Sequence, residues 1–586
     1  MRQSSTDGGV VLPDDQGIWS ALEQSLRAHP ERVVFVRVDV PDTAESEING
    51  GQLAEQARTV AAHLIAAGVE PGDRLAIMGR TSYPWALLSL AALGLGAVIV
   101  PVYPTASATQ VRHVLADSGA TWAFAESDEQ LSLVAEAAGA GLRHPVWPLE
   151  QVDGWATGGP SAFPRGSEVA AGSERFGDEF AQRGGKVRAD DIAMIIYTSG
   201  TTGLPKGCML THRNLWASSG GTVEQVGDLF RVDSTGAQAT TALGLPLAHV
   251  FGQTVLFACL YAGTRTVLLP GIPELVGALT RLRPTMLCLV PYALEKIRKR
   301  VRDLAHDEVA GALGGRLTHV ISGGASLDDT TAAFYASAGV TILNCYGLTE
   351  AATAVTVNAP ATNRRRTVGR PIPGVTVAIA EDGEVLVAGP NVSPGYWSDQ
   401  RRALGRDATG PVETRWLHTG DVGRLDDDGY LVITGRRKEI LVTASGKNVA
   451  PTPLEDRVRL HPLVSNCVVI GEGRSFVAAL ITLDPAPFAA WAQAAGIDLA
   501  AGIDLATGAG ADDERPEPLE HPRLLAELQV AVDDANSLVS RAESIRAFRV
   551  VEPDFTVAAG QLTPSLKLRR ATIERDFTAA IETIYQ

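Results

Sequence analysis

The sequence has fewer basic than acidic residues, and it has few cysteines. Its 51 Lys and Arg residues stand against 67 Asp and Glu residues, so the formal net charge at pH 7 is −16. A general nucleic-acid-binding protein presents a basic face, so this composition argues against that class. The five cysteines lie far apart and form no Cys-x-x-Cys pair. We therefore expect free thiols in a reducing cytoplasm, not disulfides or a metal site.

We expect neither an export signal nor a membrane span in this sequence. Residues 1–16 are polar and do not show a charged region followed by an apolar one. Residues 85–100 are sixteen residues without a charge, between Pro84 and Pro101. A membrane span needs about 20 residues, so we expect a buried helix followed by a strand. The run is compatible with a peripheral membrane contact but does not require one.

The length and the hydrophobic pattern predict the fold class. A chain of 586 residues is expected to form two or more domains, and 45% hydrophobic with 20% charged residues is typical of a globular protein. Helical patterns at 17–29 and 51–67 alternate with strand patterns at 33–38 and 74–78. This alternation predicts an α/β fold with mostly parallel sheets flanked by helices. The Gly- and Ser-rich residues 154–185 are expected to be a loop or connector.

One stretch has the composition of a phosphate-binding loop. It begins with an apolar run, residues 192–196, that predicts a buried strand, and it reaches Lys206 between Pro205 and Gly207. The hydroxyl and glycine residues in between are Thr198, Ser199, Gly200, Thr201, Thr202 and Gly203. Glycines let a backbone approach a ligand, and hydroxyls and backbone N–H groups donate to phosphate oxygens. An ordinary strand-to-helix turn is the alternative, but ordinary turns do not combine these residues.

The loop is not a Walker A motif, because Gly207 follows Lys206 where that motif has Ser or Thr to hold Mg²⁺. It resembles instead the phosphate-binding loop of the adenylate-forming superfamily, which includes acyl-CoA synthetases, peptide-synthetase adenylation domains and firefly luciferase. The resemblance extends from about residue 50 to the end of the chain, with the motifs in the superfamily's order. It also covers His249, for which it implies a place in the acyl pocket beside the reacting carboxylate. A structural histidine is the alternative.

Two later motifs follow predicted strands. The resemblance implies that adenine lies against the first, the turn at Gly323, Gly324 and Ala325. The second contains Tyr346, Gly347, Thr349 and Glu350. Tyr346 is suited to stack on a purine and Thr349 to donate to the α-phosphate. Glu350 is suited to hold Mg²⁺, which prefers carboxylate oxygen, and Thr198 is its second candidate ligand.

Two hairpins are predicted by Asp382-Gly383 and Asp428-Gly429; Asp421 lies between them, and Arg436 and Lys438 come after the second. The resemblance implies that Asp421 accepts hydrogen bonds from both ribose hydroxyls, with a turn aspartate as the alternative. It also implies that Arg436 reaches the nucleotide and that Lys438 is the pivot between two domains. Many relatives have Asp at this pivot, so the lysine is a departure from the common pattern.

The C-terminal part reads as a smaller α/β domain. Strands are predicted at 464–470 and 476–483 and a helix at 524–539, and the internal repeat at 495–506 is expected to be a loop expansion. The resemblance implies that Gly446 borders the CoA tunnel. It also implies that Lys567 contacts the carboxylate and the α-phosphate during adenylation.

The resemblance as a whole is closest to bacterial long-chain fatty-acid–CoA ligases. It implies a core, residues 1–437, that binds ATP and the acyl group, and a mobile lid, residues 438–586. The implied reaction converts a medium-to-long-chain fatty acid and ATP to acyl-AMP and pyrophosphate, with Mg²⁺. Coenzyme A then takes the acyl group as a thioester and AMP is released. The alternatives are a fatty acyl-AMP ligase that serves a carrier protein, a luciferase-like oxygenase, and a non-catalytic acyl or nucleotide sensor.

Overall fold

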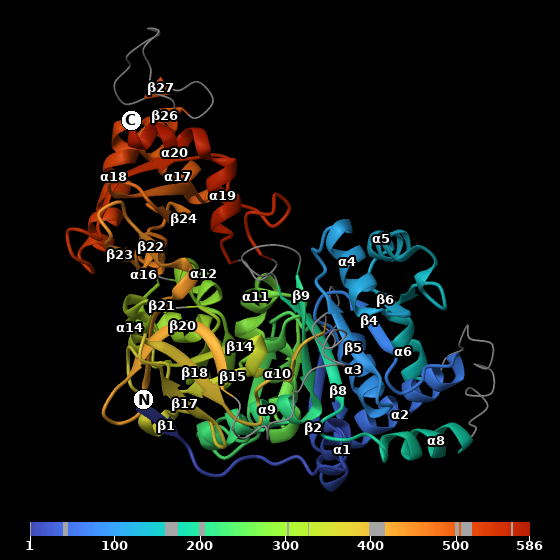
Figure 1. Ribbon diagram of the computed structural model, residues 1–586. Coiled ribbons are helices and arrows are strands. Elements are labelled where there is room, and N and C mark those ends of the chain that lie inside the picture. Colours follow the sequence, from blue (N-terminus) through green and yellow to red (C-terminus); the bar gives the residue numbers. More distant parts are fainter. Residues whose placement is uncertain are drawn as a thin grey trace. The chain divides into compact units, whose positions relative to one another are not determined.

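The computed structural model describes residues 2–38, 45–158, 174–198, 205–301, 304–325, 327–397, 416–498, 503–504, 518–563 and 567–586 (Figure 1). The chain divides into two compact units. Unit 1 spans Met1–Ala325, Asp329–Thr419 and Gly423–Ile433, and unit 2 spans Ser326–Asp328, Gly420–Val422 and Thr434–Gln586. The structure describes each unit by itself.

The largest sheet of the described residues lies in unit 1. Its strands, in spatial order, are β19 (Gly395–Tyr396), β9 (Lys206–Thr211), β8 (Ile192–Thr198), β5 (Val98–Val102), β4 (Arg74–Met78), β6 (Trp122–Ala125) and β7 (Trp147–Pro148). From β8 to β7 the neighbouring strands are parallel, whereas β9 is antiparallel to both β8 and β19. This part of the chain therefore forms the predicted, mostly parallel sheet.

Helices cover both faces of this sheet. Successive residues of a strand point to opposite sides, and here both sides are apolar and buried. Along β4, Leu75 and Ile77 belong to the main core, and Ala76 and Met78 belong to a second hydrophobic cluster. The main core includes residues of α1 (Ile18–Ala28), α2 (Gly50–Ala67) and α3 (Tyr83–Gly94), and the second cluster includes residues of α4 (Ala108–Ser118) and α5 (Asp128–Ala138). The prediction of an α/β fold is confirmed.

The uncharged run from Trp85 to Val100 is a buried helix followed by a strand, as expected. Every residue from Trp85 to Gly94 in α3 is buried, and so is every residue of β5. Within the described part of the chain, no helix combines the length and the apolar character that a membrane crossing requires.

The expectation of a connector at 154–185 is wrong for its described ends. Residues 154–156 belong to α6 (Glu150–Ala156), and α8 occupies Glu174–Gly184. In α8, Phe176 and Phe180 are buried, and the ring of Phe180 lies where a side chain at Gly94 would be. Two aromatic residues one helical turn apart thus bury a helix in a stretch whose Gly-rich, charged composition had suggested a loop.

Unit 1 contains three further sheets among its described residues. One has the order β10 (Thr240–Leu243), β11 (Arg265–Leu268), β2 (Val33–Val38), β3 (Glu45–Asn49). Another has the order β12 (Met286–Leu289), β13 (His319–Ser322), β14 (Thr341–Leu348), β15 (Thr353–Val357), β16 (Arg370–Pro371). The last has the order β1 (Arg2–Ser5), β17 (Thr376–Ile379), β18 (Glu384–Ala388), β20 (Leu417–Leu425), β21 (Leu431–Arg436), and its residues 420–422 and 434–436 are counted with unit 2.

The remaining helical segments of unit 1 connect these strands. They are η1 (Gly139–Gly141), α9 (His212–Val226), η2 (Gly227–Phe230), α10 (Val250–Ala262), α11 (Ile272–Leu282), α12 (Pro291–Val301), α13 (His306–Ala312), α14 (Asp329–Ser337), η3 (Thr349–Ala351) and η4 (Pro360–Thr362).

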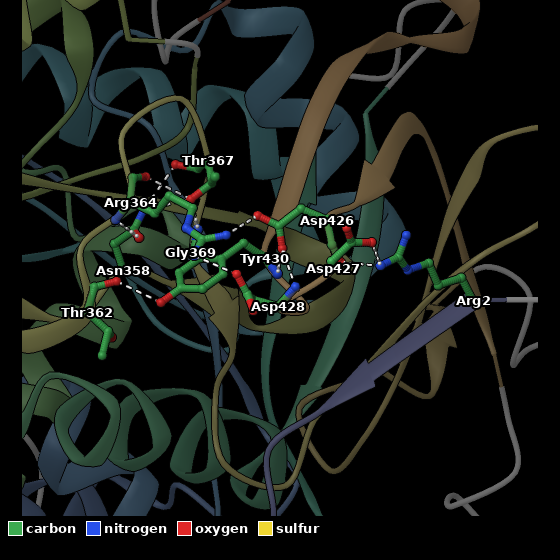
Figure 2. Close-up of polar contacts among 10 residues, drawn as sticks. All are labelled: Arg2, Asn358, Thr362, Arg364, Thr367, Gly369, Asp426, Asp427, Asp428 and Tyr430. Carbon is green, nitrogen blue, oxygen red and sulfur yellow. Dashed lines mark hydrogen bonds and ion pairs between the residues drawn. The ribbon is translucent and has the colours of Figure 1, made fainter.

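Polar contacts anchor the turn between β20 and β21 (Figure 2). Arg364 forms ion pairs of 2.6 Å with Asp426 and 2.7 Å with Asp428, and its guanidinium lies 4.3 Å from the centre of the Tyr430 ring. Arg2, in the first strand, pairs with Asp427 at 2.7 Å. The turn itself contains the predicted Asp-Gly pair, with Gly429 at φ 81°. Residues far apart in the sequence thus hold one predicted hairpin.

Unit 2 is the smaller α/β unit that the pattern predicts. Its strands are β22 (Leu441–Val442), β23 (Asn448–Val449), β24 (Val464–Ile470), β25 (Val477–Leu483), β26 (Ile497–Asp498), β27 (Ile503–Asp504) and β28 (Ile545–Val550). Its helical segments are η6 (Arg437–Glu439), α16 (Pro451–Val458), α17 (Pro485–Ala495), η7 (Pro518–Glu520), α18 (Pro522–Asn536), α19 (Arg570–Asp576) and α20 (Thr578–Tyr585). The repeated Ile-Asp pairs of the internal repeat face each other as the antiparallel β26 and β27.

Candidate active site

The predicted phosphate loop connects two antiparallel strands. Thr198 ends β8 and Lys206 begins β9, and the two residues are partners in the strand register. Both ends of the loop are therefore adjacent at one edge of the large sheet. The candidate residues Ser199, Gly200, Thr201, Thr202 and Gly203 lie outside the described residues.

Helix α4 supports the ends of this loop. His113 Nε2 lies 2.7 Å from the carbonyl oxygen of Pro205, and the Tyr197 hydroxyl donates to the Asp117 carboxylate at 2.7 Å. Gly207 has no room for a side chain, because a Cβ would lie 2.7 Å from Ile195 and 2.9 Å from the ring of Tyr197. The strands before and after the loop are thus closely packed, and this packing fixes the position of the Lys206 backbone.

Glu350 lies near the lysine end of the loop. Its Oε1 accepts a 2.6 Å hydrogen bond from the hydroxyl of Tyr396, and the Lys206 ammonium lies 5.5 Å from the centre of the same ring. Tyr396 is in β19, where it pairs with Cys208 of β9. Strand pairing therefore brings together the lysine of one motif and the carboxylate of another, about 140 residues apart in the sequence. The sequence reasoning missed Tyr396, because nothing in its local sequence indicates this pairing.

The backbone around Glu350 is constrained. Thr349 and Glu350 lie in the short helical turn η3, which ends at Ala351. The next two residues, Ala352 and Thr353, have positive φ values of 47° and 87°. Gly347 lies at a β-bulge where a Cβ would be 1.4 Å from the carbonyl oxygen of Thr353. Backbone of this kind costs on the order of 1–3 kcal/mol per residue and persists only where the surroundings fix it.

Side chains from other elements fix this backbone. The Thr254 hydroxyl lies 2.9 Å from the Thr353 hydroxyl and 3.2 Å from the carbonyl oxygen of Ala352. Asn391 Nδ2 donates to the carbonyl oxygen of Ala354 at 2.9 Å. Glu350 is therefore presented by a rigid turn, which suits a residue that must hold a ligand in one place.

The predicted adenine turn and Tyr346 lie beside each other. Strands β13 and β14 are parallel neighbours, and the turn at Gly323, Gly324 and Ala325 follows β13 directly. A Cβ at Gly323 would lie 2.4 Å from the sulfur of Cys345, and Gly324 has a φ of 87°. Ligands of α/β sheets bind where parallel strands end, so this edge is suited to a planar ring. At position 323 only glycine fits, because the strand with Cys345 lies so close.

His249 caps helix α10. Its Nδ1 accepts a 3.0 Å hydrogen bond from the backbone N–H of Phe251, so the neutral ring carries its proton on Nε2. The ring of Tyr103 lies edge-on at 6.5 Å. In the first two turns of α10, Phe251 and Val255 line an apolar cavity of about 20 Å³, which has room for little more than one water molecule.

The thiols of Cys345 and Cys259 are not nucleophiles. Burial raises the pKa of Cys345 to about 12 and that of Cys259 to about 12, so both remain neutral thiols near pH 7. All five cysteines are free, as the sequence predicts. Among the described residues, no cluster of three or more His, Cys, Asp or Glu side chains is arranged to hold a metal ion.

The other candidate residues lie in unit 2. Arg436 Nε donates to Asp421 at 2.8 Å, and Asp421 is buried whereas Arg436 is exposed. Lys438 is exposed in η6. Gly446, with a φ of 78°, lies in the turn between β22 and β23, and Lys567 is exposed with its backbone N–H bonded to the Thr563 hydroxyl at 3.0 Å. The structure thus brings Asp421 and Arg436 together.

The structure gives a local reason for the glycine at position 446. No atom lies within 4 Å of the position that a Cβ would take. Space in the described structure therefore does not require glycine here, but the positive φ favours it.

Comparison with known proteins identifies relatives over the whole chain. The sequence model of the AMP-binding enzyme family matches residues 22–397, and that of the AMP-binding enzyme C-terminal domain matches residues 438–497. The long-chain-fatty-acid–CoA ligases FadD15 of Mycobacterium bovis and Mycobacterium tuberculosis are each 36% identical to the chain. Each alignment covers 100% of this chain and 100% of the relative.

Solved structures share the fold. The anthranilate CoA ligase AuaEII in complex with anthranoyl-AMP is 21% identical, with a TM-score of 0.71 over 97% of this chain and 99% of that chain. ATP-bound MatB from Rhodopseudomonas palustris is 23% identical, with a TM-score of 0.69 over 97% of this chain and 100% of that chain. With a family match over more than half of its length and full-length relatives at 36% identity, the chain belongs to the AMP-binding enzyme family.

Proposed function

We propose that this protein is a long-chain fatty-acid–CoA ligase. It activates a medium-to-long-chain fatty acid with ATP to acyl-AMP, and it then transfers the acyl group to coenzyme A. The observation that carries the proposal is the full-length identity of 36% to relatives named long-chain-fatty-acid–CoA ligase. The five free thiols suit a reducing compartment, which supports a cytoplasmic location.

In the first half-reaction, an oxygen of the fatty-acid carboxylate attacks the α-phosphorus of ATP. The bond from that phosphorus to the bridging oxygen breaks, and pyrophosphate leaves. The attack brings one anion to another, so the protein must stabilise negative charge in the transition state. We assign this to the loop from Thr198 to Lys206 and to Lys567. The substrate carboxylate is its own nucleophile, so no protein nucleophile is required.

The residues present fit a magnesium ion that is shared with the nucleotide. Mg²⁺ in nucleotide sites is commonly bound by one or two protein oxygen ligands and by substrate phosphates, not by an all-protein cage. Glu350 supplies one carboxylate on a rigid turn, and Thr198 is the second candidate ligand. When bound, the ion would neutralise charge on the phosphate oxygens. The role of the Tyr396 hydroxyl is to hold Glu350 in place.

The adenosine part is assigned to the two strand ends beside Cys345. Gly323 and Gly324 bring no side chain to this turn and Ala325 brings only a methyl group, and Tyr346 lies in the neighbouring strand, β14. Asp421 is assigned to the ribose hydroxyls, because a buried carboxylate accepts from two donors at once. Its present partner, Arg436, would then share it with the nucleotide.

The acyl tail is assigned to the apolar region behind His249. The cavity beside Phe251 and Val255 is far smaller than a fatty-acid chain, so side chains of α10 must move when the tail enters. Each buried CH₂ contributes up to about 0.8 kcal/mol, and this gain favours longer acids.

In the second half-reaction, the CoA sulfur attacks the acyl carbon and loses its proton to solvent. The carbon–oxygen bond to AMP breaks, and AMP leaves. We assign residues 1–437 to the ATP- and acyl-binding core and residues 438–586 to the lid. Lys438 would be the pivot, Gly446 would border the path of CoA, and Lys567 would serve only the first half-reaction.

The test is a panel of acids with ATP and Mg²⁺, assayed for pyrophosphate release and, with free CoA, for the thioester. Hexadecanoate and dodecanoate should give a higher kcat/KM than acetate or benzoate, and mass spectrometry should find acyl-CoA. Higher kcat/KM for acetate or benzoate would overturn the substrate class. Pyrophosphate release without thioester would indicate transfer to a carrier protein, and the absence of ATP–pyrophosphate exchange would indicate a sensor.

A further inference from the structure

A second cavity lies in unit 1, outside the residues assigned to the active site. Its volume is about 210 Å³, and it lies between the C-terminal end of α1, strand β2 and the C-terminal end of α10. Its polar lining includes Ser25, His29, Arg32 and Arg231. None of these residues belongs to a motif of the predicted nucleotide, acyl or CoA sites. The cavity therefore needs its own explanation.

Arg32 has more hydrogen-bond donors than partners. A guanidinium has five N–H donors. Nη2 of Arg32 donates a long hydrogen bond of 3.4 Å to the carbonyl oxygen of Arg231. No carboxylate of the described residues forms an ion pair with it. The hydroxyl of Ser25, on the same cavity wall, also forms no hydrogen bond with a described residue. The cavity thus presents a partly buried cation and several donors without an acceptor.

The balance of charge in the cavity is positive. Arg231 shares the carboxylate of Glu224, at 2.5 Å, with the Tyr261 hydroxyl, at 2.9 Å. Its guanidinium also lies 5.9 Å from the centre of the Tyr261 ring. The carboxylate of Glu224 therefore pairs with Arg231 and offsets the charge of that arginine. Burial and the charge of Arg231 lower the pKa of Arg32 from its ordinary value, so an added anion would be stabilising here.

A structural role for Arg32 is the main alternative. Its guanidinium lies 2.8 Å from the position of a Cβ at Gly263, which ends α10 with a φ of 70°. A cation at a helix C-terminus interacts favourably with the helix dipole. That interaction uses the charge of Arg32 but leaves its N–H donors without acceptors. It accounts for the position of the guanidinium and not for the open cavity in front of it.

We propose that this cavity binds a compact phosphate-class oxyanion through the guanidinium groups of Arg32 and Arg231 and the hydroxyl of Ser25. Guanidinium groups bind phosphate oxygens in pairs, and charge-assisted hydrogen bonds of this kind are the strong ones. Inorganic phosphate, pyrophosphate and a small phosphate monoester share this chemistry, and the volume of the cavity suits any of them. The site is separate from the phosphate loop and does not depend on the proposed function.

The test is calorimetric titration of the full-length protein with inorganic phosphate, with AMP at saturation to occupy the nucleotide site. The wild type should bind one phosphate. Arg32→Gln should weaken that binding at least tenfold, and Arg32→Lys, which keeps the charge but not the paired donors, should weaken it less. Glu224→Gln should tighten it severalfold, because it removes the competing carboxylate. Arg27→Gln is the matched control, since Arg27 pairs with Glu23 on α1 outside the cavity, and it should leave binding unchanged.

Repeating the titration with pyrophosphate and a phosphate monoester identifies the source, because the natural ligand should bind most tightly. Three results would overturn the proposal: no phosphate binding to the wild type, equal binding to Arg32→Gln and the wild type, or binding that AMP abolishes. A loss of thermal stability in Arg32→Gln without any phosphate effect would assign Arg32 to the helix end alone. Arg32→Lys keeps the test valid if Arg32→Gln does not fold.

Discussion

The hydroxyl of Tyr396 donates a 2.6 Å hydrogen bond to the carboxylate of Glu350. The same ring has the Lys206 ammonium 5.5 Å from its centre. One aromatic side chain therefore links the end of the predicted phosphate loop to the predicted metal ligand. The relationship depends on the pairing of β19 with β9, which the structure shows directly.

Replacing Tyr396 with phenylalanine should slow adenylation. The change keeps the ring but removes the donor that orients Glu350, and a hydrogen bond to a charged group is worth about 1.5–3 kcal/mol. ATP–pyrophosphate exchange should therefore fall by roughly tenfold or more. The loss should appear mainly as a higher Mg²⁺ requirement, because the carboxylate itself remains.

Tyr430→Phe is the control for this substitution. Its hydroxyl donates to the carbonyl oxygen of Thr362 at 2.8 Å, in the hairpin anchor of Figure 2. This variant should keep the wild-type dependence on Mg²⁺. An equal effect of both variants would show that Tyr396 acts through general stability.

Glu350→Gln tests the metal site directly. The substitution keeps the size of the side chain but removes its charge, so adenylation should fall strongly at low Mg²⁺ and recover in part at high Mg²⁺. Glu129→Gln, on an exposed position of α5, is the matched control. Near-normal rates across the whole Mg²⁺ titration would remove Glu350 from the site.

The local fold could be predicted from the sequence where one pattern dominates. Strands β2, β4 and β24 begin and end where the hydrophobic pattern predicts. Helix α2 ends at Gly68, whose φ of 96° explains the helix stop. Helix α8 could not be predicted, because only Phe176 and Phe180 mark its buried face in a polar stretch. Its stability comes from packing against distant residues, which a local pattern does not contain.

The same limit applies to the candidate site. The motifs indicated the candidate residues, but the contact between Tyr396 and Glu350 depends on pairing between strands about 190 residues apart. The positive φ values of Ala352 and Thr353 were also not predictable, because Thr254 and Asn391 hold that turn from elsewhere in the chain. The roles assigned to the site residues remain predictions.

The stability of unit 1 should fall as the pH falls below 6.5. Burial lowers the pKa of His212 from 6.5 to about 4, and its Nδ1 accepts from the backbone N–H of Ile18 at 3.2 Å. Between these two pH values the unfolded chain binds the additional proton and the folded chain does not. The free energy of unfolding should therefore be highest above pH 6.5 and should fall toward pH 4, by about 1.4 kcal/mol per pH unit.

His212→Gln removes this titration, so its thermal midpoint should depend less on pH than that of the wild type between pH 6.5 and 4.5. His521→Gln is the control, because His521 also accepts from a backbone N–H at a helix start, that of Arg523. The hypothesis fails if His212→Gln loses as much stability over this pH range as the wild type does.

The last prediction concerns the two half-reactions, which we assign to two orientations of the lid. Lys567 is expected at the carboxylate during adenylation, and Gly446 beside the path of CoA during thioester formation. Lys567→Ala should therefore lose acyl-AMP formation but still convert supplied acyl-AMP to acyl-CoA. Gly446→Trp should do the reverse, releasing pyrophosphate in a first turnover but forming little thioester. Lys438→Pro should impair the orientation that a stiffened pivot disfavours.

The controls for the Gly446 and Lys567 variants separate the side chain's chemistry from damage to the fold. Gly446 has a φ of 78°, so any side chain strains its backbone, and Gly446→Ala applies that strain without the bulk of tryptophan. Gly446→Ala should therefore form thioester much faster than Gly446→Trp. Lys567→Arg, which keeps the positive charge, should retain more adenylation than Lys567→Ala. If Lys567→Ala and Gly446→Trp each lose both half-reactions equally, a lid with two orientations does not explain this protein, because only alternation predicts opposite defects in one domain.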